Sequence, residues 1–172
     1  VSGFPWKLAD KTLRFWNLQT GQELWSRKHD WELTAVAISP NGGLVASGGL
    51  IRERVIHLWD AATGREVGQL TWHAKSGEGI MTGDVAFSPD GRYLLSSSAD
   101  MTVRLWNLKT RELLFTLYHS LDDDWVMWTP QGYYTSSPRG DDYVGWQLSR
   151  GPARSAHYIK ARQLRGTLKR PD

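Results

Sequence analysis

The sequence lacks cysteine altogether among its 172 residues. This excludes disulfide bonds, thiolate-bound zinc or iron–sulfur centres and a cysteine nucleophile from this stretch of chain. It also lacks long hydrophobic runs: none approaches the roughly 18 residues that a membrane helix needs, and residues 1–7 show no basic-then-apolar signal pattern. We therefore expect a cytoplasmic protein with no cofactor, no bound metal and no membrane partner.

Acidic residues are scarce near the C-terminal end. From Arg150 onward there are seven Arg or Lys and one acid, Asp172, whereas residues 1–149 carry 14 basic and 17 acidic side chains. The net charge of +3 therefore comes from the tail and does not indicate a general polyanion binder. No nucleic-acid-binding module is present either, so nucleic acid is not an expected partner.

The basic tail has a second pattern. Tyr158, Ala161, Leu164 and Leu168 recur at helical spacing, with basic side chains on the other face. This spacing predicts a short helix or linker in residues 151–172 that lies against the rest of the protein.

Tryptophan, in contrast, is abundant, with ten residues, and several of them recur periodically. Three six-residue segments align, Thr12–Asn17, Val55–Asp60 and Thr102–Asn107, and each ends in Trp followed by Asn or Asp. Their tryptophans are 43 and 47 residues apart, and a weaker copy that ends at Trp146 follows after a further 40. Such a period indicates an internal structural repeat.

Each repeat has a local β pattern. The turn signals Ser39–Gly42, Ser88–Gly91 and Thr129–Gly132 are each flanked by short runs that are typical of strands. The Trp-bearing strand and one further strand complete a unit of four. Four-stranded units that stack radially and bury their faces against one another form a β-propeller.

With these motifs the chain resembles the WD-repeat family of propellers, in which Trp59–Asp60 carries the family's Trp-Asp pair. The resemblance implies an all-β fold: a partial β-propeller of about three and a half four-stranded antiparallel blades, with a short C-terminal tail. The predicted boundaries are the second half of a blade at 1–28, blades at 29–72 and 73–118, a degenerate closing blade at 119–150 and the tail at 151–172. The closing unit also resembles the end of WD arrays in bacterial multidomain proteins with caspase-like peptidase or signalling domains.

The resemblance also implies a hydrogen-bond chain of His, Ser or Thr, Asp and Trp in each blade, because a buried indole N–H needs an acceptor. The second blade offers His29, Ser47 and Trp59, with Glu53 where Asp is expected. The third blade offers His73, a serine among Ser96–Ser98, Asp100 and Trp106. The predicted structural residues are therefore His29, Trp59, His73, Ser98, Asp100, Trp106, Trp16 and Trp146.

Serine, histidine and aspartate are also the residue types of a hydrolase triad. Here the set recurs from blade to blade, whereas a catalytic set is needed once, and no Gly-x-Ser-x-Gly elbow accompanies the serines. We therefore expect no catalytic residues. The run Asp122–Asp124 could hold calcium or magnesium, but no Gly-punctuated Asp-x-Asp loop with a closing Glu is present. The alternatives are a solvated acidic loop and an acidic edge that docks a partner.

In WD-repeat propellers, partners often dock on the face that holds the loops before the first strand and between the second and third strands. Arg, Trp and Met are residue types that anchor interfaces, although Trp31 and Trp72 could simply pack between blades. The partner-binding candidates that the resemblance implies are Glu32, Thr34, Arg52, Met81, Gly83, Asp122 and Asp124, with Trp31 and Trp72 nearby.

The sequence thus predicts a non-enzymatic platform for protein–protein interaction. Because Val1–Gly3 looks like the end of a second strand, we expect the C-terminal part of a longer chain, or a ring completed by a second copy. The alternative is a sensor or regulatory module of a bacterial multidomain effector, whose peptidase or NTPase domain would lie upstream.

Overall fold

The computed structural model describes residues 11–30, 32–50, 55–71, 81–148 and 157–170. The chain divides into two compact units: the first comprises residues up to Asp100 together with Trp106–Glu112, and the second comprises Met101–Leu105 together with the residues from Leu113 onward. Several predictions concern residues outside the described ranges: the strand at Val1–Gly3, and Trp31, Arg52, Glu53, Trp72 and His73.

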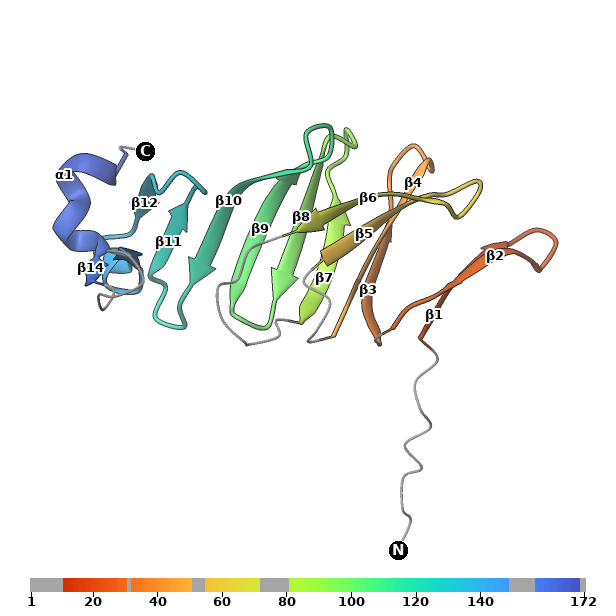
Figure 1. Ribbon diagram of the computed structural model, residues 1–172, viewed down its shortest axis with the longest axis horizontal. Helices are drawn as coiled ribbons and strands as arrows, with labels where there is room; N and C mark the ends of the chain where they lie inside the picture. Colours follow the sequence, from red (N-terminus) through yellow and green to blue (C-terminus); the bar gives the residue numbers. More distant parts are fainter. Residues whose placement is uncertain (1–10, 31, 51–54, 72–80, 149–156, 171–172) are drawn as a thin grey trace, which may run out of the picture. The chain divides into compact units, whose positions relative to one another are not determined.

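The described chain is almost entirely β, and within each sheet consecutive strands pair antiparallel (Figure 1). A two-stranded hairpin comes first, with strands β1 (Thr12–Asn17) and β2 (Gln22–Lys28). A four-stranded sheet of order β3-β4-β5-β6 follows, with strands Leu33–Ile38, Leu44–Gly49, Val55–Asp60 and Glu66–Thr71. The predicted all-β fold with four-stranded antiparallel blades is confirmed.

Strands β7 to β12 form a sheet of order β12-β11-β10-β9-β8-β7. Their bounds are β7 Thr82–Phe87, β8 Tyr93–Ser98, β9 Thr102–Asn107, β10 Glu112–His119, β11 Trp125–Trp128 and β12 Tyr134–Ser136. Strand β10 is eight residues long, and its second half pairs with β11 from Thr116↔Trp128 to His119↔Trp125.

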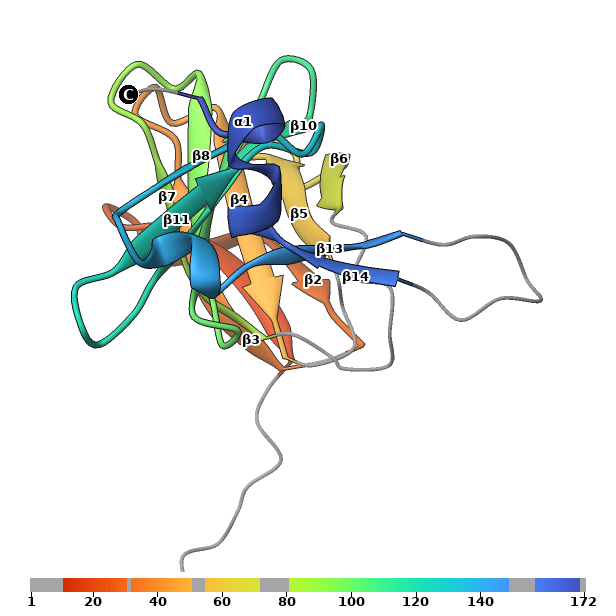
Figure 2. The same cartoon turned by 90° about the vertical axis from the view of Figure 1, so that its left-hand side faces the viewer.

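The second unit ends in short elements, which face the viewer in Figure 2. These are η1 (Gly140–Asp142), β13 (Gly145–Leu148), β14 (His157–Lys160), η2 (Ala161–Leu164) and α1 (Arg165–Leu168). The helical spacing of the tail is therefore realised only near its end. Residues 157–160 are extended instead, because β14 pairs antiparallel with β13, with Trp146 opposite Ile159.

The residue after each repeated Trp shapes the turn that follows. Asn17 Oδ1 accepts hydrogen bonds from the backbone N–H of Gln19 and Thr20, and Asp60 and Asn107 cap their turns in the same way. An Asn or Asp side chain thus satisfies turn donors. Four positions later the backbone is left-handed in each of these three copies, with φ of 69°, 64° and 61° at Gly21, Gly64 and Arg111.

Candidate functional site

Two buried indoles of the first unit donate hydrogen bonds to equivalent serines, each on the neighbouring strand of the same sheet. Trp59 Nε1 donates to Ser47 Oγ at 2.8 Å, and Trp106 Nε1 donates to Ser96 Oγ at 2.9 Å. Both rings are buried. Ser47 and Ser96 are each the fourth residue of their strand, so the acceptor in the later repeat is Ser96. The predicted Ser98 is not the acceptor, because it lies two positions beyond Ser96 in β8.

His29 also reaches this cluster. Its buried ring meets Trp59 and His57 edge-on, with both centroid distances at 5.3 Å. His57 Nδ1 lies 2.8 Å from Glu66 Oε1. Burial raises the pKa of the Glu66 carboxyl, but hydrogen bonds from His57 and Gln69 outweigh it, and the pKa falls below its ordinary value. The structure therefore brings His29 and Trp59 together as neighbours in one core cluster.

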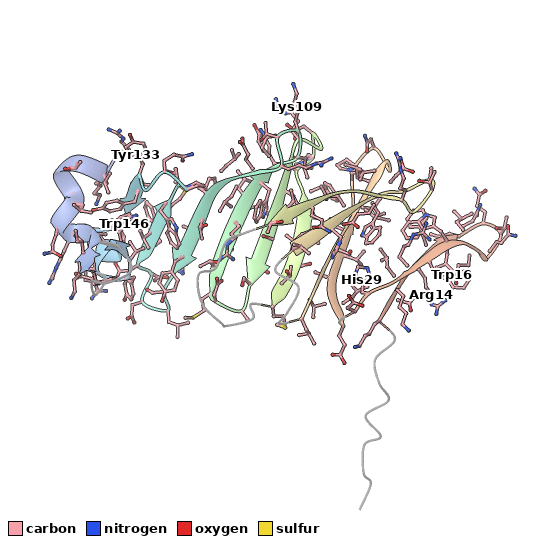
Figure 3. The ribbon with its side chains drawn as sticks, viewed as in Figure 1. Arg14, Trp16, His29, Lys109, Tyr133 and Trp146 are labelled. Carbon is pink, nitrogen blue, oxygen red and sulfur yellow. The ribbon has the colours of Figure 1, made fainter. Side chains whose placement is uncertain are left out.

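The two outer tryptophans differ from each other. Trp16 projects from the β1–β2 hairpin with 48% of its surface exposed (Figure 3), so the expectation that it packs between sheets was wrong. Among the described strands, none flanks β1 as β4 flanks β5, so the described residues place no strand serine beside Trp16 as Ser47 lies beside Trp59. Trp146 is half-buried against Tyr134, with ring centroids 5.5 Å apart.

A further tryptophan, which sequence reasoning missed, joins the β1–β2 hairpin to the next sheet. Trp25 stacks on Phe15 at 5.0 Å, and its Nε1 donates to the Ala61 carbonyl at 2.8 Å. A Cβ at Gly64 would lie 2.5 Å from the Trp25 ring, so only glycine fits there. The one available signal was the surplus of tryptophans outside the Trp-Asp/Asn motif.

Arginine side chains make similar links. Arg27 Nε donates to the Gly64 carbonyl at 2.7 Å, and its Nη2 donates to the Thr63 carbonyl at 3.1 Å. Arg111 donates to the Val67 carbonyl and fills the space beside Gly68. In each case a guanidinium from one sheet is bonded to the main chain of the neighbouring sheet.

The predicted partner-binding residues of the first unit occupy equivalent places in two successive repeats. The carbonyl of Glu32 accepts from the N–H of Leu50 at 2.9 Å, just before β3, and the carbonyl of Met81 accepts from the N–H of Ala99 at 3.1 Å, just before β7. Thr34 and Gly83 each sit at a register shift, where the strand bulges against its partner. Bulges re-aim side chains at sheet ends.

These two places lie next to each other. Thr34 Oγ1 donates to the Thr82 carbonyl, and at Gly48 a Cβ would come within 2.7 Å of the Thr82 side chain. The starts of β3 and β7 therefore touch. We call this surface, made of Glu32, Thr34, Met81 and Gly83, the loop edge. The β3–β4 and β7–β8 turns and Lys109 lie at the opposite edge of the strands (Figures 1 and 3).

In the second unit the acidic run divides by exposure. Asp124 is buried, accepts from Ser137 Oγ at 2.9 Å and forms an ion pair with Arg139 at 2.9 Å. Its carboxylate therefore holds the loop and is not available to a partner. Asp122 and Asp123 are exposed.

The second unit also contains a buried charge that the sequence did not single out. Arg165 Nη2 donates to Asp141 Oδ1 at 2.7 Å, its Nε donates to Oδ2, and Tyr134 donates its hydroxyl to the Ala161 carbonyl at 2.8 Å. The hydrogen bonds from Arg165 hold the pKa of the buried Asp141 carboxyl below its ordinary value. Burial raises the pKa of Tyr134. Tyr134, Asp141 and Arg165, here called the C-terminal clamp, tie the tail to η1 and β12.

The described residues contain no grouping of three or more His, Asp or Glu side chains that could bind a metal ion. None of the helices within the described ranges is both long and apolar enough to cross a membrane. Of the triad that was considered, Ser98 Oγ accepts from the backbone N–H of Asp100, at 3.4 Å, and His73 is outside the described residues.

Known proteins resemble the chain over its repeats. Residues 21–60 and 64–107 match the family model described as WD domain, G-beta repeat. Over 86 residues the chain is 40% identical to nuclear distribution protein PAC1-2 of Uncinocarpus reesii, an alignment covering 46% of this chain and 18% of that protein. It is 33% identical over 86 residues to small ribosomal subunit protein RACK1 of Glycine max, covering 50% of this chain and 24% of that protein.

The solved structure of U3-55K shares the fold, with a TM-score of 0.56 and 20% identity over 74% of this chain and 46% of that one. The chain spans a quarter or less of the curated relatives named above. Those relatives are eukaryotic and give no support to the resemblance to bacterial multidomain proteins. Residues 21–60 and 64–107 are thus similar in sequence to WD repeats, and their paired strands and Trp–Ser bonds agree with that similarity.

Proposed function

We propose that this chain is a segment of a WD-repeat propeller that serves, without catalysis, as a platform for protein–protein interaction in the cytoplasm. A closed propeller typically has four to eight blades, so the remaining blades would come from a longer chain or a second copy. The similarity to RACK1, which is named as a small ribosomal subunit protein, supports a role within a larger assembly.

The observation that carries this proposal is the contact between the starts of β3 and β7 at the loop edge. The Thr34–Thr82 hydrogen bond and the close approach at Gly48 join two successive repeats into one surface. The carbonyls of Glu32 and Met81 are already bonded within their own sheets. The backbone is therefore fixed while Thr34 and Gly83 are exposed, and a fixed surface loses little entropy when a partner binds.

A non-enzymatic role is supported by how the polar groups of the core are used. Ser47 and Ser96 accept from buried indoles, and both carboxylate oxygens of Asp141 bind Arg165. Groups that are engaged in this way stabilise sheets and loops, whereas a catalytic group must be presented to a substrate.

The proposal is tested with a photo-crosslinking amino acid placed at Gly83 and, as a matched control, at Lys109 on the opposite edge. Both chains are exposed to an extract of the source organism and irradiated. We expect a discrete protein adduct at position 83 and a weaker or absent one at position 109. Equal yields at the two positions, or a higher yield at 109, would contradict a binding role for the loop edge.

A further inference from the structure

The turn between β10 and β11 displays an apolar side chain on an ordered backbone. Leu121 is fully exposed, at 102%, yet its turn is well held. The N–H of Ser120 donates to the Asp124 carbonyl at 2.7 Å, and Ser120 Oγ accepts from the N–H groups of Asp122 and Asp124, each at 3.2 Å. The buried Asp124 carboxylate anchors the turn further. The exposure of Leu121 is therefore a fixed property of the fold.

A second exposed apolar residue lies at the same end of the neighbouring strand. Met101, which is 65% exposed, directly precedes β9. Strands β9 and β10 are antiparallel neighbours, so the start of β9 lies beside the end of β10, as Figure 1 shows. Each turn contains a non-glycine residue in the left-handed region, Met101 with φ 63° and Asp123 with φ 62°. Such conformations cost free energy and persist where the surroundings impose them.

The surroundings of these apolar tips are acidic. Asp122 and Asp123 follow Leu121 in the chain, and the Asp123 side chain is 98% exposed. His119, itself more than half exposed, lies 4.0 Å from the Asp123 carboxylate. Two exposed apolar side chains at the same end of neighbouring strands, one of them followed by two aspartates, complement a segment that has an apolar side chain next to Lys or Arg. The same carboxylates repel the phosphates of nucleic acids and anionic lipids.

We propose that a basic protein segment docks on a surface that we call the acidic tip and inserts an apolar side chain between Met101 and Leu121. The acidic tip consists of Met101, Leu121, Asp122 and Asp123. This inference rests on the proposed function and specifies the chemistry of a partner. Because the hydrogen bonds of Ser120 already order the β10–β11 turn, binding requires little further ordering.

The test is a selection of random short peptides displayed on phage against the full chain, with the Met101→Ser/Leu121→Ser variant as the depletion target. Peptides that bind the parent and not the variant are expected to be rich in Lys and Arg around one large apolar residue. The inference is overturned if no peptide depends on these two side chains, or if the dependent peptides are acidic.

The charges are tested separately on a selected peptide. Asp122→Asn/Asp123→Asn is expected to raise its Kd about tenfold at about 50 mM salt, and the effect should shrink at about 300 mM because salt screens exposed charges. Gln131→Ser, in the β11–β12 turn, is the matched control and should leave the Kd unchanged. Unaltered melting curves would show that the variants fold. An unchanged Kd in the double Asn variant would contradict the proposal of a basic partner. This outcome is independent of the crosslinking at Gly83, which lies in the first unit.

Discussion

At the scale of single residues, the bond between Trp59 and Ser47 allows a direct measurement. Both groups are buried, so Ser47→Ala leaves an indole N–H without its acceptor. We expect the free energy of unfolding to fall by about 1–3 kcal/mol, measured by urea denaturation. In a Trp59→Phe background, where no N–H remains, the same serine change should cost much less. Equal costs in the two backgrounds would show that this hydrogen bond contributes nothing.

Two glycines separate backbone strain from steric exclusion. Gly21 and Gly64 share a left-handed backbone, but a Cβ at Gly21 meets nothing within 4 Å, whereas at Gly64 it would overlap the Trp25 ring. Gly21→Ala should cost about 1 kcal/mol from backbone strain alone. Gly64→Ala should cost about 2 kcal/mol more, because the indole must move out of a packed site. Comparable urea midpoints for the two variants would contradict the packing of Trp25 against the Gly64 turn.

The sequence predicted part of this residue-level picture. A recurring Trp with a serine in the preceding strand is visible as a pattern, and in the second blade the prediction named Ser47 and Trp59. The links of Trp25 and Arg27 were missed because their acceptors are main-chain carbonyls. Every residue has such a carbonyl, so nothing in the sequence marks the acceptor. In the same way, Ser96 and Ser98 differ only in register, which depends on the fold.

At the scale of one element, we predict how the pKa of Asp90 in the β7–β8 turn responds to mutation. Hydrogen bonds from Ser88 Oγ and from Arg92 lower the pKa of Asp90 from 3.8 to about 2. A lowered pKa in the folded state means that the charged carboxylate stabilises the turn above about pH 4, and that this contribution is lost as the pH falls toward 2. Ser88→Ala should raise the Asp90 pKa toward 3.8, read from its carboxyl carbon by NMR. Ser97→Ala, in which Asp90 keeps its partners, should leave the pKa at about 2.

At the C-terminal clamp, we predict that Arg165 contributes more to the free energy of unfolding than its neighbour Arg162. Arg165→Met leaves the buried Asp141 carboxylate without its main partner, and we expect a loss of about 2 kcal/mol, reduced from the fully buried case because Arg165 is half exposed. Arg162→Met removes only the exposed pair with Asp142 at 3.3 Å and should cost less than about 0.5 kcal/mol. Urea unfolding measures both. Similar losses would show that the Asp141 pair behaves as an ordinary surface pair.

The tail shows where sequence patterning misleads at this scale. Tyr158, Ala161, Leu164 and Leu168 are spaced as on a helix, yet residues 157–160 form a strand. Pairing with β13 satisfies the backbone of β14, and the burial of Ala161 beside Val126 and Tyr134 fixes where the chain turns. Tertiary contacts override a weak helical preference over so short a segment.

At the scale of the whole molecule, the lowered pKa values of four carboxyl groups all make the free energy of unfolding fall in acid. Among the described residues, Asp60, Glu66, Asp90 and Asp141 have pKa values below their ordinary ones, so these four carboxyl groups bind fewer protons in the folded state than in the unfolded chain as the pH falls below about 4.5. The free energy of unfolding should therefore decrease from pH 6 to pH 3. Urea melts at several pH values measure this slope. In Asp141→Asn, which removes one of the four groups, the slope should be smaller; a stability that rises toward pH 3 would contradict the assignment.

The repeat period was enough to predict the antiparallel four-stranded sheets, because a fixed interval in the sequence indicates a repeated structural unit. The half-exposed Trp16 was not predictable, since its burial depends on which strand flanks β1. The loop edge was predicted from family resemblance. The contact that joins its two halves, from Thr34 to the Thr82 carbonyl, appears only in three dimensions.

The links between neighbouring sheets have a consequence for how such a chain could evolve. Trp25, Arg27, Thr34 and Arg111 all donate to main-chain carbonyls across a sheet boundary. A carbonyl is present whatever side chain the neighbour carries, so a duplicated or transplanted unit would find its acceptors already in place. Gene duplication could therefore lengthen the array without coordinated substitutions on both sides of each new junction, and the exposed turns would be left free to diverge.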